Sequence, residues 1–233
     1  MKGLKADLHT HAKEDSYHQL SYTAKELIDE AHRLKYDVLS LTFHRKVFEG
    51  PKFEQARRYA EKKGMLLIPG TEANIEGKDV LIYNITEKER RKIRTLRDLR
   101  KLKLDLQKKG RNILVIAPHP YFGNGVMGKY CIGRKLVKNI DIFDAIEYSF
   151  FYLKRVNRNK KAVKVAKRYL KPMVGNGDIH SMENLNLTFT MINSAKNVDS
   201  VITAIKQGNV KVVTKPLTVR RIVKMAYMHS FKI

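Results

Sequence analysis

Short apolar runs alternate with longer amphipathic stretches along almost the whole chain. The apolar runs are typical of strands buried on both faces, whereas the stretches between them repeat their apolar residues at helical spacing. Strands are predicted at 3–8, 37–43, 65–70, 112–118, within 141–149, at 171–177 and at 209–214. Helices are predicted at 21–36, 52–64, 86–110, 153–170, 198–208 and 216–231, and residues 73–85 predict a hairpin around Glu76–Lys78.

Strands that alternate with helices indicate an α/β protein with a mainly parallel sheet. Roughly seven such units favour a distorted, seven-stranded β/α (TIM-like) barrel over a short doubly wound sheet. No repeat, low-complexity linker or shift in composition divides the chain, so a single domain over residues 1–233 is expected. In such barrels the chemistry lies at the carboxyl ends of the strands.

Histidines and acids gather after the predicted strands. One His-x-His pair alone is a weak signal, because a single histidine at a strand end is more often a hydrogen-bonded or surface residue. Here candidates follow five different strands, which core histidines would not do: His9, His11, His44, Glu72, His119, Asp178 and His180. His32 and His229 are interpreted as structural, and His18 is ambiguous.

Imidazoles mixed with carboxylates favour zinc, manganese or iron over magnesium or calcium alone. The candidate ligands exceed the needs of one ion, so two or three divalent metal ions are expected. Such a centre lowers the pKa of a bound water and neutralises charge on phosphate oxygens. The expected chemistry is therefore hydrolysis of a phosphate ester by a metal-activated hydroxide.

The charge of the chain points to anionic partners. Lysine and arginine total 47 against 23 acids, a net charge of +24, which favours a phosphate-ester substrate and nucleic acid as a partner over a merely lysine-rich background. No apolar run could span a membrane and no signal-peptide core begins the chain, so a cytoplasmic protein without a membrane partner is expected. Cys131 is the only cysteine and cannot form an intramolecular disulfide. No pattern indicates an oligomeric state.

Two basic segments and one loop are candidates for substrate binding. Residues 88–111 contain twelve basic residues and three acids, and residues 154–171 contain nine and none. The loop 121–135 follows His119, and its Lys129, Arg134 and Lys135 are expected to grip a phosphate.

Five motifs make the chain resemble the PHP (polymerase and histidinol phosphatase) superfamily over nearly its whole length. They are DLHTH at 7–11 with Asp15-Ser16 behind it, LTFH at 41–44, IPGTE at 68–72, APHP at 117–120 and GNGDIH at 175–180. The resemblance, to an archaeal-like single-domain member, implies a metal-dependent phosphoesterase on a barrel of the PHP type.

The resemblance also implies a set of metal ligands and their division among the ions. His9, His11, Glu72 and Asp178 would hold one metal, Glu72 would bridge to a second that His119 also binds, and Asp15, His44 and His180 would lie towards the remaining site. Glu72, Asp178 and His180 are the expected catalytic residues.

Two positions depart from the family pattern. Phe43 stands where the second motif usually has an acid, whose loss would leave His44 without an orienting partner. The hairpin after Glu72 lacks the family's usual histidine, and whether Asp79 replaces it is left open.

The function expected is thus a phosphoesterase acting on nucleotides or nucleic acid. Two alternatives stay open. One is a non-catalytic RNA- or DNA-binding protein on a PHP-like barrel, similar to the PHP-like protein subunit of archaeal ribonuclease P. The other is a small-molecule phosphatase, such as one for histidinol phosphate, which leaves the positive charge without a role.

Overall fold

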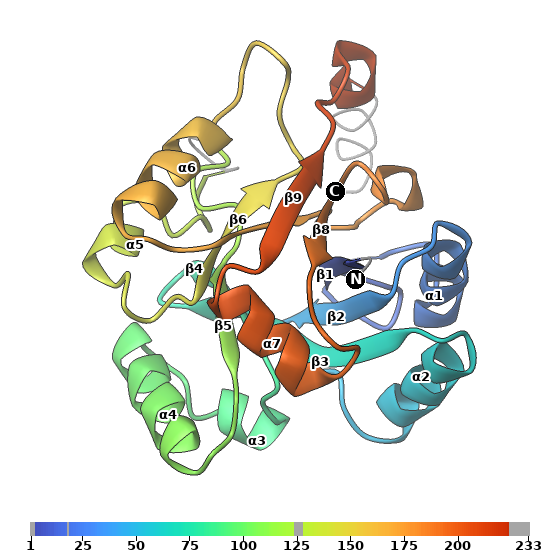
Figure 1. Ribbon diagram of the computed structural model, residues 1–233, viewed down its shortest axis with the longest axis horizontal. Helices are drawn as coiled ribbons and strands as arrows, with labels where there is room; N and C mark the ends of the chain where they lie inside the picture. Colours follow the sequence, from blue (N-terminus) through green and yellow to red (C-terminus); the bar gives the residue numbers. More distant parts are fainter. Residues whose placement is uncertain (1–2, 18, 124–127, 224–233) are drawn as a thin grey trace.

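The computed structural model describes residues 3–17, 19–123 and 128–223, which fold into one curved sheet surrounded by helices (Figure 1). The strands are β1 (Leu4–Thr10), β2 (Val38–His44), β3 (Leu66–Ile75), β4 (Lys78–Tyr83), β5 (Leu114–Ala117), β6 (Ala145–Ser149), β7 (Met173–Asn176), β8 (Thr188–Ile192) and β9 (Val210–Thr214). The helices are α1 (Ala24–Arg33), α2 (Pro51–Lys62), α3 (Glu87–Arg90), α4 (Leu96–Lys108), α5 (Lys135–Lys138), α6 (Asn159–Arg168) and α7 (Val198–Lys206), with a 3-10 turn η1 at Met182–Asn184. Of the last predicted helix, residues 219–223 are helical and 216–218 are not, because Leu217 forms a bridge with Leu153, and residues 224–231 lie outside the described residues.

The sheet order is β7-β6-β5-β4-β3-β2-β1-β8-β9. The α/β barrel expected from the sequence is therefore confirmed in outline, but nine strands form in the described part of the chain, so the count of seven is not confirmed. Four neighbouring pairs are parallel and four antiparallel, which makes the sheet mixed rather than mainly parallel. The antiparallel pairs come from the β3–β4 hairpin and from β8, which the sequence reading missed.

The sheet curls until its two edges meet. Strand β7 lies against β8 and β9 at the opposite edge, and one side chain joins them. The Gly175 N–H donates to the Thr190 hydroxyl at 2.9 Å, and this hydroxyl donates to the Gly175 carbonyl at 2.8 Å. The strands come so close that a Cβ on Gly175 would lie 2.8 Å from a methyl carbon of Val212. A glycine is needed where the barrel closes.

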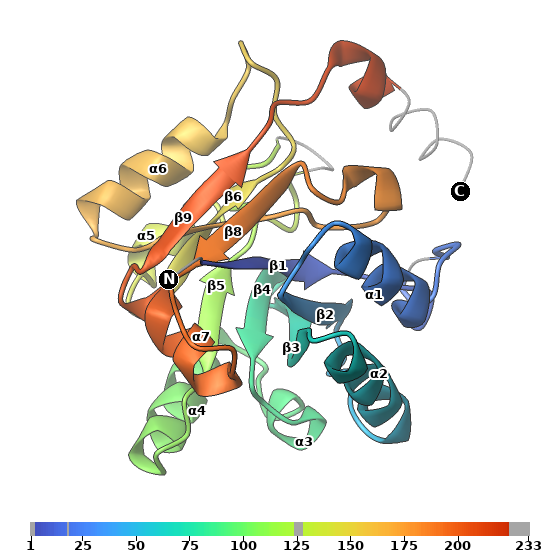
Figure 2. The same cartoon turned by 45° about the vertical axis from the view of Figure 1, so that its right-hand side comes forward.

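The interior of the barrel is apolar and one mouth is plugged. Residues from eight strands, among them Leu8, Leu81 and Val174, pack with one face of α7. Figure 1 shows α7 near the centre of the view with α1, α2, α4 and α6 around the periphery, and Figure 2 shows the same arrangement turned by 45°. With one mouth filled by α7, polar side chains can gather only at the other mouth, where the parallel strands end.

Two predicted helices are shorter in the structure. The helix expected over 86–110 is divided into α3 and α4, because Thr95 begins a new capping box with Asp98. The helix expected over 153–170 begins only at Asn159, whose side chain bonds both the N–H and the carbonyl of Ser149 at 2.9 Å. Residues 150–158 therefore connect β6 to α6 as an irregular segment.

None of the helices formed by the described residues combines the length and the apolarity needed to cross a lipid bilayer.

The closure of the barrel can be tested through the fully buried Thr190. Replacing it by valine keeps the volume but leaves the Gly175 N–H and carbonyl without their partner, which should cost about 1–3 kcal/mol in the free energy of unfolding measured in urea. Thr190→Ser keeps the hydroxyl and should cost less than about 1 kcal/mol. Equal stability of the valine variant and the wild type would show that this hydroxyl does not hold the two edges together.

Candidate metal centre

The first and last histidine motifs are brought together by backbone pairing beyond the end of β7. Thr10 and Ile179 form a parallel bridge, with the His11 N–H donating to the Ile179 carbonyl and the Ile179 N–H to the His9 carbonyl, both at 3.2 Å. The bridge places Asp178 and His180, the neighbours of Ile179, beside His9 and His11, the neighbours of Thr10. Thr10 and Ile179, 169 positions apart in the chain, thus lie side by side.

Asp178 and His180 consequently face the first pair of histidines. The Nε2 atoms of His9 and His11 lie 3.4 and 3.6 Å from Asp178 Oδ1. The rings of His11 and His180 stack with centroids 4.4 Å apart.

Glu72 lies at the centre of the cluster, midway along β3. Its Oε2 is 3.3 Å from His9 Nε2, 3.5 Å from His11 Nε2 and 3.1 Å from His44 Nε2. Its Oε1 lies 3.2 Å from His119 Nε2. The two oxygens of one carboxylate therefore face two different sets of imidazoles, as a bridging ligand would.

Asp15 holds two imidazoles from their far side. Its Oδ2 lies 3.0 Å from His11 Nδ1 and 2.7 Å from His44 Nδ1, and it accepts the His44 N–H at 3.1 Å. An Nδ1–H donated to a carboxylate leaves Nε2 with its lone pair towards the cluster. Phe43, which stands where the family usually has an acid, is buried in the apolar core. His44 nevertheless has an acidic partner, because Asp15 takes that place.

Glu147, which the sequence reading missed, does the same for His9. It is fully buried in β6, with Oε2 3.0 Å from His9 Nδ1, and it accepts the Asn176 side-chain amide at 3.0 Å and the His119 N–H at 3.0 Å. The signal in the sequence was an acid inside an apolar strand, since a buried carboxylate needs partners.

Asp7 joins β1 to the turn after β7. It accepts the Gly177 N–H at 3.1 Å with both oxygens, and the His9 N–H at 3.1 Å. Burial raises the pKa of Asp7 to about 7, although these N–H groups oppose the rise. A Cβ on Gly177 would lie 2.7 Å from the same carboxylate, so the GNGD turn needs glycine there.

The electrostatics of the cluster favour a bound cation. Burial alone would raise the pKa values of Glu72 and Asp178, but the neighbouring histidines, His9 first, hold both well below their ordinary range. Burial would lower the pKa values of His9 and His119, yet Asp178 and Glu72 for His9, and Cys131 and Glu72 for His119, raise them well above the ordinary range. Ionised carboxylates here attract positive charge, which a metal ion can supply in place of protons.

The ligand atoms form three overlapping groups, each with its atoms within 4.8 Å of one another. The groups are His9, His11 and Asp178; His9, Glu72 and His119; and His11, His44 and His180. Seven of the eight metal ligands expected from the sequence thus come together, and Asp15 stands behind two of them. The clusters are compatible with metal binding, and their overlap allows more than one ion.

Four buried atoms test whether a metal fits. His9 Nε2, His11 Nε2, Glu72 Oε2 and Asp178 Oδ1 have no hydrogen-bond partner among the described residues. Their contacts of 3.3–3.6 Å match the edge of about 3.4 Å expected for a tetrahedron around an ion with bonds of about 2.1 Å. Buried polar atoms without partners are costly, so the chain fits the ion that the motifs implied.

A hollow of about 170 Å³ opens on this centre. It is lined by Tyr17, His44, Arg45, Glu72, Asn74, Asp79 and Tyr130. Asp79, left open as a ligand, accepts the Asn74 amide at 2.9 Å and lies outside the three ligand groups. Burial, with help from Glu72, raises its pKa to about 6.

The residues expected to grip the substrate separate in the structure. Arg134 lines a groove beside His119. Lys129 lies over the ring of Tyr130, and Lys135 begins α5; neither is among the described residues that line that groove.

One histidine interpreted as structural, His32, is described by the structure and lies outside the three ligand groups. His32 is exposed on α1, and His18 and His229 lie outside the described residues.

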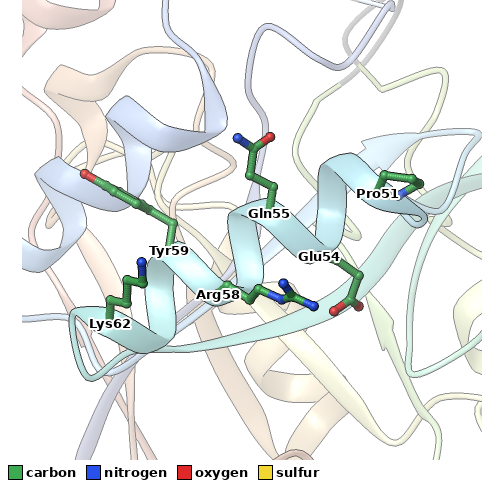
Figure 3. Close-up of a pocket in the computed structure, with 6 residues that line it drawn as sticks. All are labelled: Pro51, Glu54, Gln55, Arg58, Tyr59 and Lys62. Carbon is green, nitrogen blue, oxygen red and sulfur yellow. The ribbon is translucent and has the colours of Figure 1, made fainter.

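A second hollow, of about 500 Å³, lies along α2 (Figure 3). The six residues drawn there all belong to one helix, and their side chains spread outward instead of converging. It holds no candidate ligand and is a surface depression.

Comparison with known proteins supports the fold. Residues 156–210, which include α6, β7, β8 and α7, match the family model described as PHP-associated. No curated protein sequence matches the chain.

Among solved structures, one similar protein is a two-domain protein from Bacteroides vulgatus ATCC 8482 that contains a predicted PHP-like metal-dependent phosphoesterase. It is 19% identical with a TM-score of 0.66, over 91% of this chain and 64% of that one. PsfC from Pseudomonas syringae PB-5123 is 18% identical with a TM-score of 0.67, over 98% of both chains. The lesion-specific endonuclease PfuEndoQ from Pyrococcus furiosus is 13% identical with a TM-score of 0.55, over 96% of this chain and 66% of that one.

At these identities the structural similarity shows a shared fold. The chain spans about two thirds of the length of the Bacteroides and Pyrococcus proteins. The resemblance to PHP proteins, first seen in the motifs, is confirmed by this fold and by the PHP-associated segment.

The role of Glu147 can be measured by metal affinity. Glu147→Gln keeps the shape but cannot hold the His9 imidazole as a carboxylate does, so affinity for Zn²⁺ or Mn²⁺ should fall roughly 10- to 100-fold in a titration against a chromogenic chelator. Glu61→Gln, on the exposed face of α2, is the matched control and should bind as the wild type does. Wild-type affinity in Glu147→Gln would show that this carboxylate does not orient a ligand.

Proposed function

We propose that this protein is a metal-dependent phosphoesterase, with nucleotides or nucleic acid as its favoured substrates, and that residues 1–233 form one catalytic domain. The observation that carries the proposal is the convergence of four buried ligand atoms without hydrogen-bond partners in the described part of the chain. The PHP-like fold supports the same activity, and the endonuclease among the similar structures supports a nucleic-acid substrate.

Two or three ions of zinc, manganese or iron fit this donor set, because imidazole and carboxylate ligands suit these metals. When bound, they supply an activated water and neutralise the charge that develops on the phosphate oxygens. His9, His11, Glu72 and Asp178 would hold one ion, Glu72 and His119 a second, and His44 and His180 would face a third.

The chain's own contribution is rigid placement. Asp15 and Glu147 fix three imidazoles with Nε2 towards the centre, and the Thr10–Ile179 bridge fixes Asp178 and His180 against them. Little of the arrangement has to reorganise during the reaction. A preformed electrostatic site accelerates a reaction because its groups need no reorganisation in the transition state.

The hollow beside Glu72 is the proposed entry for the phosphate group. Arg45 is its cationic wall, and the ring of Tyr17 lies between this arginine and His44, 5.0 Å from the guanidinium and 4.7 Å from the imidazole. An arginine held in this way can meet phosphate oxygens as they approach the metals.

Loss of the ligands should abolish the reaction. His9→Ala and Asp178→Ala should each lower the rate of metal-dependent phosphoester hydrolysis by at least about 1000-fold, since the metals supply several kcal/mol of transition-state stabilisation. The measurement is release of phosphate or nucleotide from monoesters, nucleotides and short oligonucleotides with Mn²⁺. His32→Ala, on the exposed surface of α1, should keep wild-type rates.

The same panel separates the alternatives. Full activity in His9→Ala would contradict the assignment of the centre. If no substrate is hydrolysed by the wild type while nucleic acid is bound, the protein is a binding protein on this fold. If only phosphate monoesters that carry no nucleoside are hydrolysed, it is a small-molecule phosphatase.

A further inference from the structure

A basic groove of about 570 Å³ lies between α6 and the loop that follows His119. We define it by its charged side chains, Arg134, Arg158, Lys160, Lys161 and Lys164, which face the loop residues Pro120 and Tyr121. Figure 1 shows α6 beside this loop on the outer side of the barrel. Its volume is that of a ligand site, and five of its twelve lining residues are cationic.

The groove differs from the other basic segment of the chain in how its charge is balanced. In residues 88–111, five of the twelve cations pair with acids: Arg90 and Arg91 with Glu87, Arg100 with Asp141, Lys103 with Asp144 and Arg111 with Glu89. In contrast, no carboxylate of the described residues lies within 4 Å of the charged groups of Arg134, Lys160, Lys161 or Lys164.

Like charges spaced along one helix destabilise it unless an anion offsets them. Arg134 and the three exposed lysines of α6, Lys160, Lys161 and Lys164, are therefore cations that an external anion can neutralise together.

The groove lies directly behind one wall of the candidate metal centre. Pro120 in its lining follows His119 in the chain, and Cys131, also in the lining, has its sulfur 3.7 Å from His119 Nδ1. The Nε2 of the same imidazole lies 3.2 Å from Glu72. The imidazole of His119 thus lies between the groove and Glu72. A strand bound in the groove would lie about one ring's width from the metal centre.

Aromatic rings lie along the same loop. The ring of Phe122 meets the His119 ring at 6.1 Å and the Phe151 ring at 4.7 Å, and Lys161 lies over the ring of Tyr121 at 4.5 Å. Proteins bind single-stranded nucleic acid with cations interleaved with half-exposed aromatic rings. The phosphates contact the cations, and the bases stack on the rings.

We propose that the basic groove binds single-stranded nucleic acid and positions the strand for a phosphodiester to reach the metal centre. The second part rests on the proposed function, whereas the binding does not. A single strand is favoured over a duplex because the ligands are recessed, with His9 and His11 fully buried, and only a flexible strand can bend a phosphate into them. An anionic lipid surface is disfavoured because the cations line a hollow and do not form an exposed flat face.

The test compares two charge reversals at the same helical spacing. One variant carries Lys160→Glu and Lys164→Glu in the groove, and the control carries Arg97→Glu and Lys101→Glu on the exposed face of α4. Both remove the same positive charge from the full-length, metal-loaded protein. Binding is followed by fluorescence anisotropy of a labelled phosphorothioate oligothymidylate of about twelve nucleotides, over a series of salt concentrations, with oligouridylate, duplex DNA and phosphatidylserine vesicles as competitors.

The groove variant should bind the oligonucleotide at least roughly tenfold more weakly, and its log–log salt slope should fall by about one to two, since each lost phosphate contact on a single strand removes about 0.7. The control variant should bind within about twofold of the wild type. Hydrolysis of p-nitrophenyl phosphate, which is too small to reach the groove, should be unchanged in both.

Three outcomes would overturn the inference: equal affinity of groove variant and wild type, equal weakening in both variants, or competition by vesicles or duplex but not by single strands. These outcomes are separate from failure of the proposed function. If His9→Ala retained full hydrolysis, the assignment of the metal centre would be wrong. The affinities of the groove and control variants would still decide whether the groove binds a single strand.

Discussion

The pairing of the end of β1 with the segment after β7 is the constraint on which the site depends. The bridge between Thr10 and Ile179 sets the end of β1 against the segment after β7, so that His9 and His11 lie beside Asp178 and His180. A change in this pairing would separate the ligands of the first motif from those of the last. Asp7 strengthens the pairing through the Gly177 N–H, and Asn176 accepts the Leu8 N–H at 3.0 Å.

This pairing is possible because the barrel closes at the same place. Thr190 joins β7 to β8 through one hydroxyl, and the absence of a side chain on Gly175 lets the strands approach. Because a side chain of β8 makes this contact, the edge of β7 that faces β8 forms no backbone ladder. The segment after β7 can therefore lie against β1. The motif GNGDIH thus combines structural residues with candidate ligands in six positions.

The cluster is stable as a unit only with positive charge among its carboxylates. Burying Glu72 and Asp178 as anions is costly without paired cations, and the surrounding imidazoles satisfy only part of this need. The same carboxylates would bind a metal, and the acids behind the imidazoles hold the ring nitrogens in place. The positive charge of the surface is separate from this balance, and part of it lies where α6 meets the loop after His119.

Much of the site could be read from the sequence, because strands, helices and the positions of polar residues at strand ends are local patterns. The alternation of elements indicated an α/β barrel, and seven of the eight expected ligands come together in the structure. The division of the helix at Thr95 and the strand β8 were local signals that were missed: a second capping box, and the run of β-branched and aromatic residues in TFTMI.

Other features could be decided only by the tertiary structure, since they join residues that nothing local connects. The role of Glu147 behind His9 depends on β6 lying inside the barrel, and Asp15 faces the Nδ1 atoms of His11 and His44 only after β1 and β2 have paired. The balance of charge was equally invisible, because the sequence counts cations without showing which have acids beside them. The residue types of the centre were determined by the sequence; which atoms face the metal, and which cations remain for an external anion, were decided by packing.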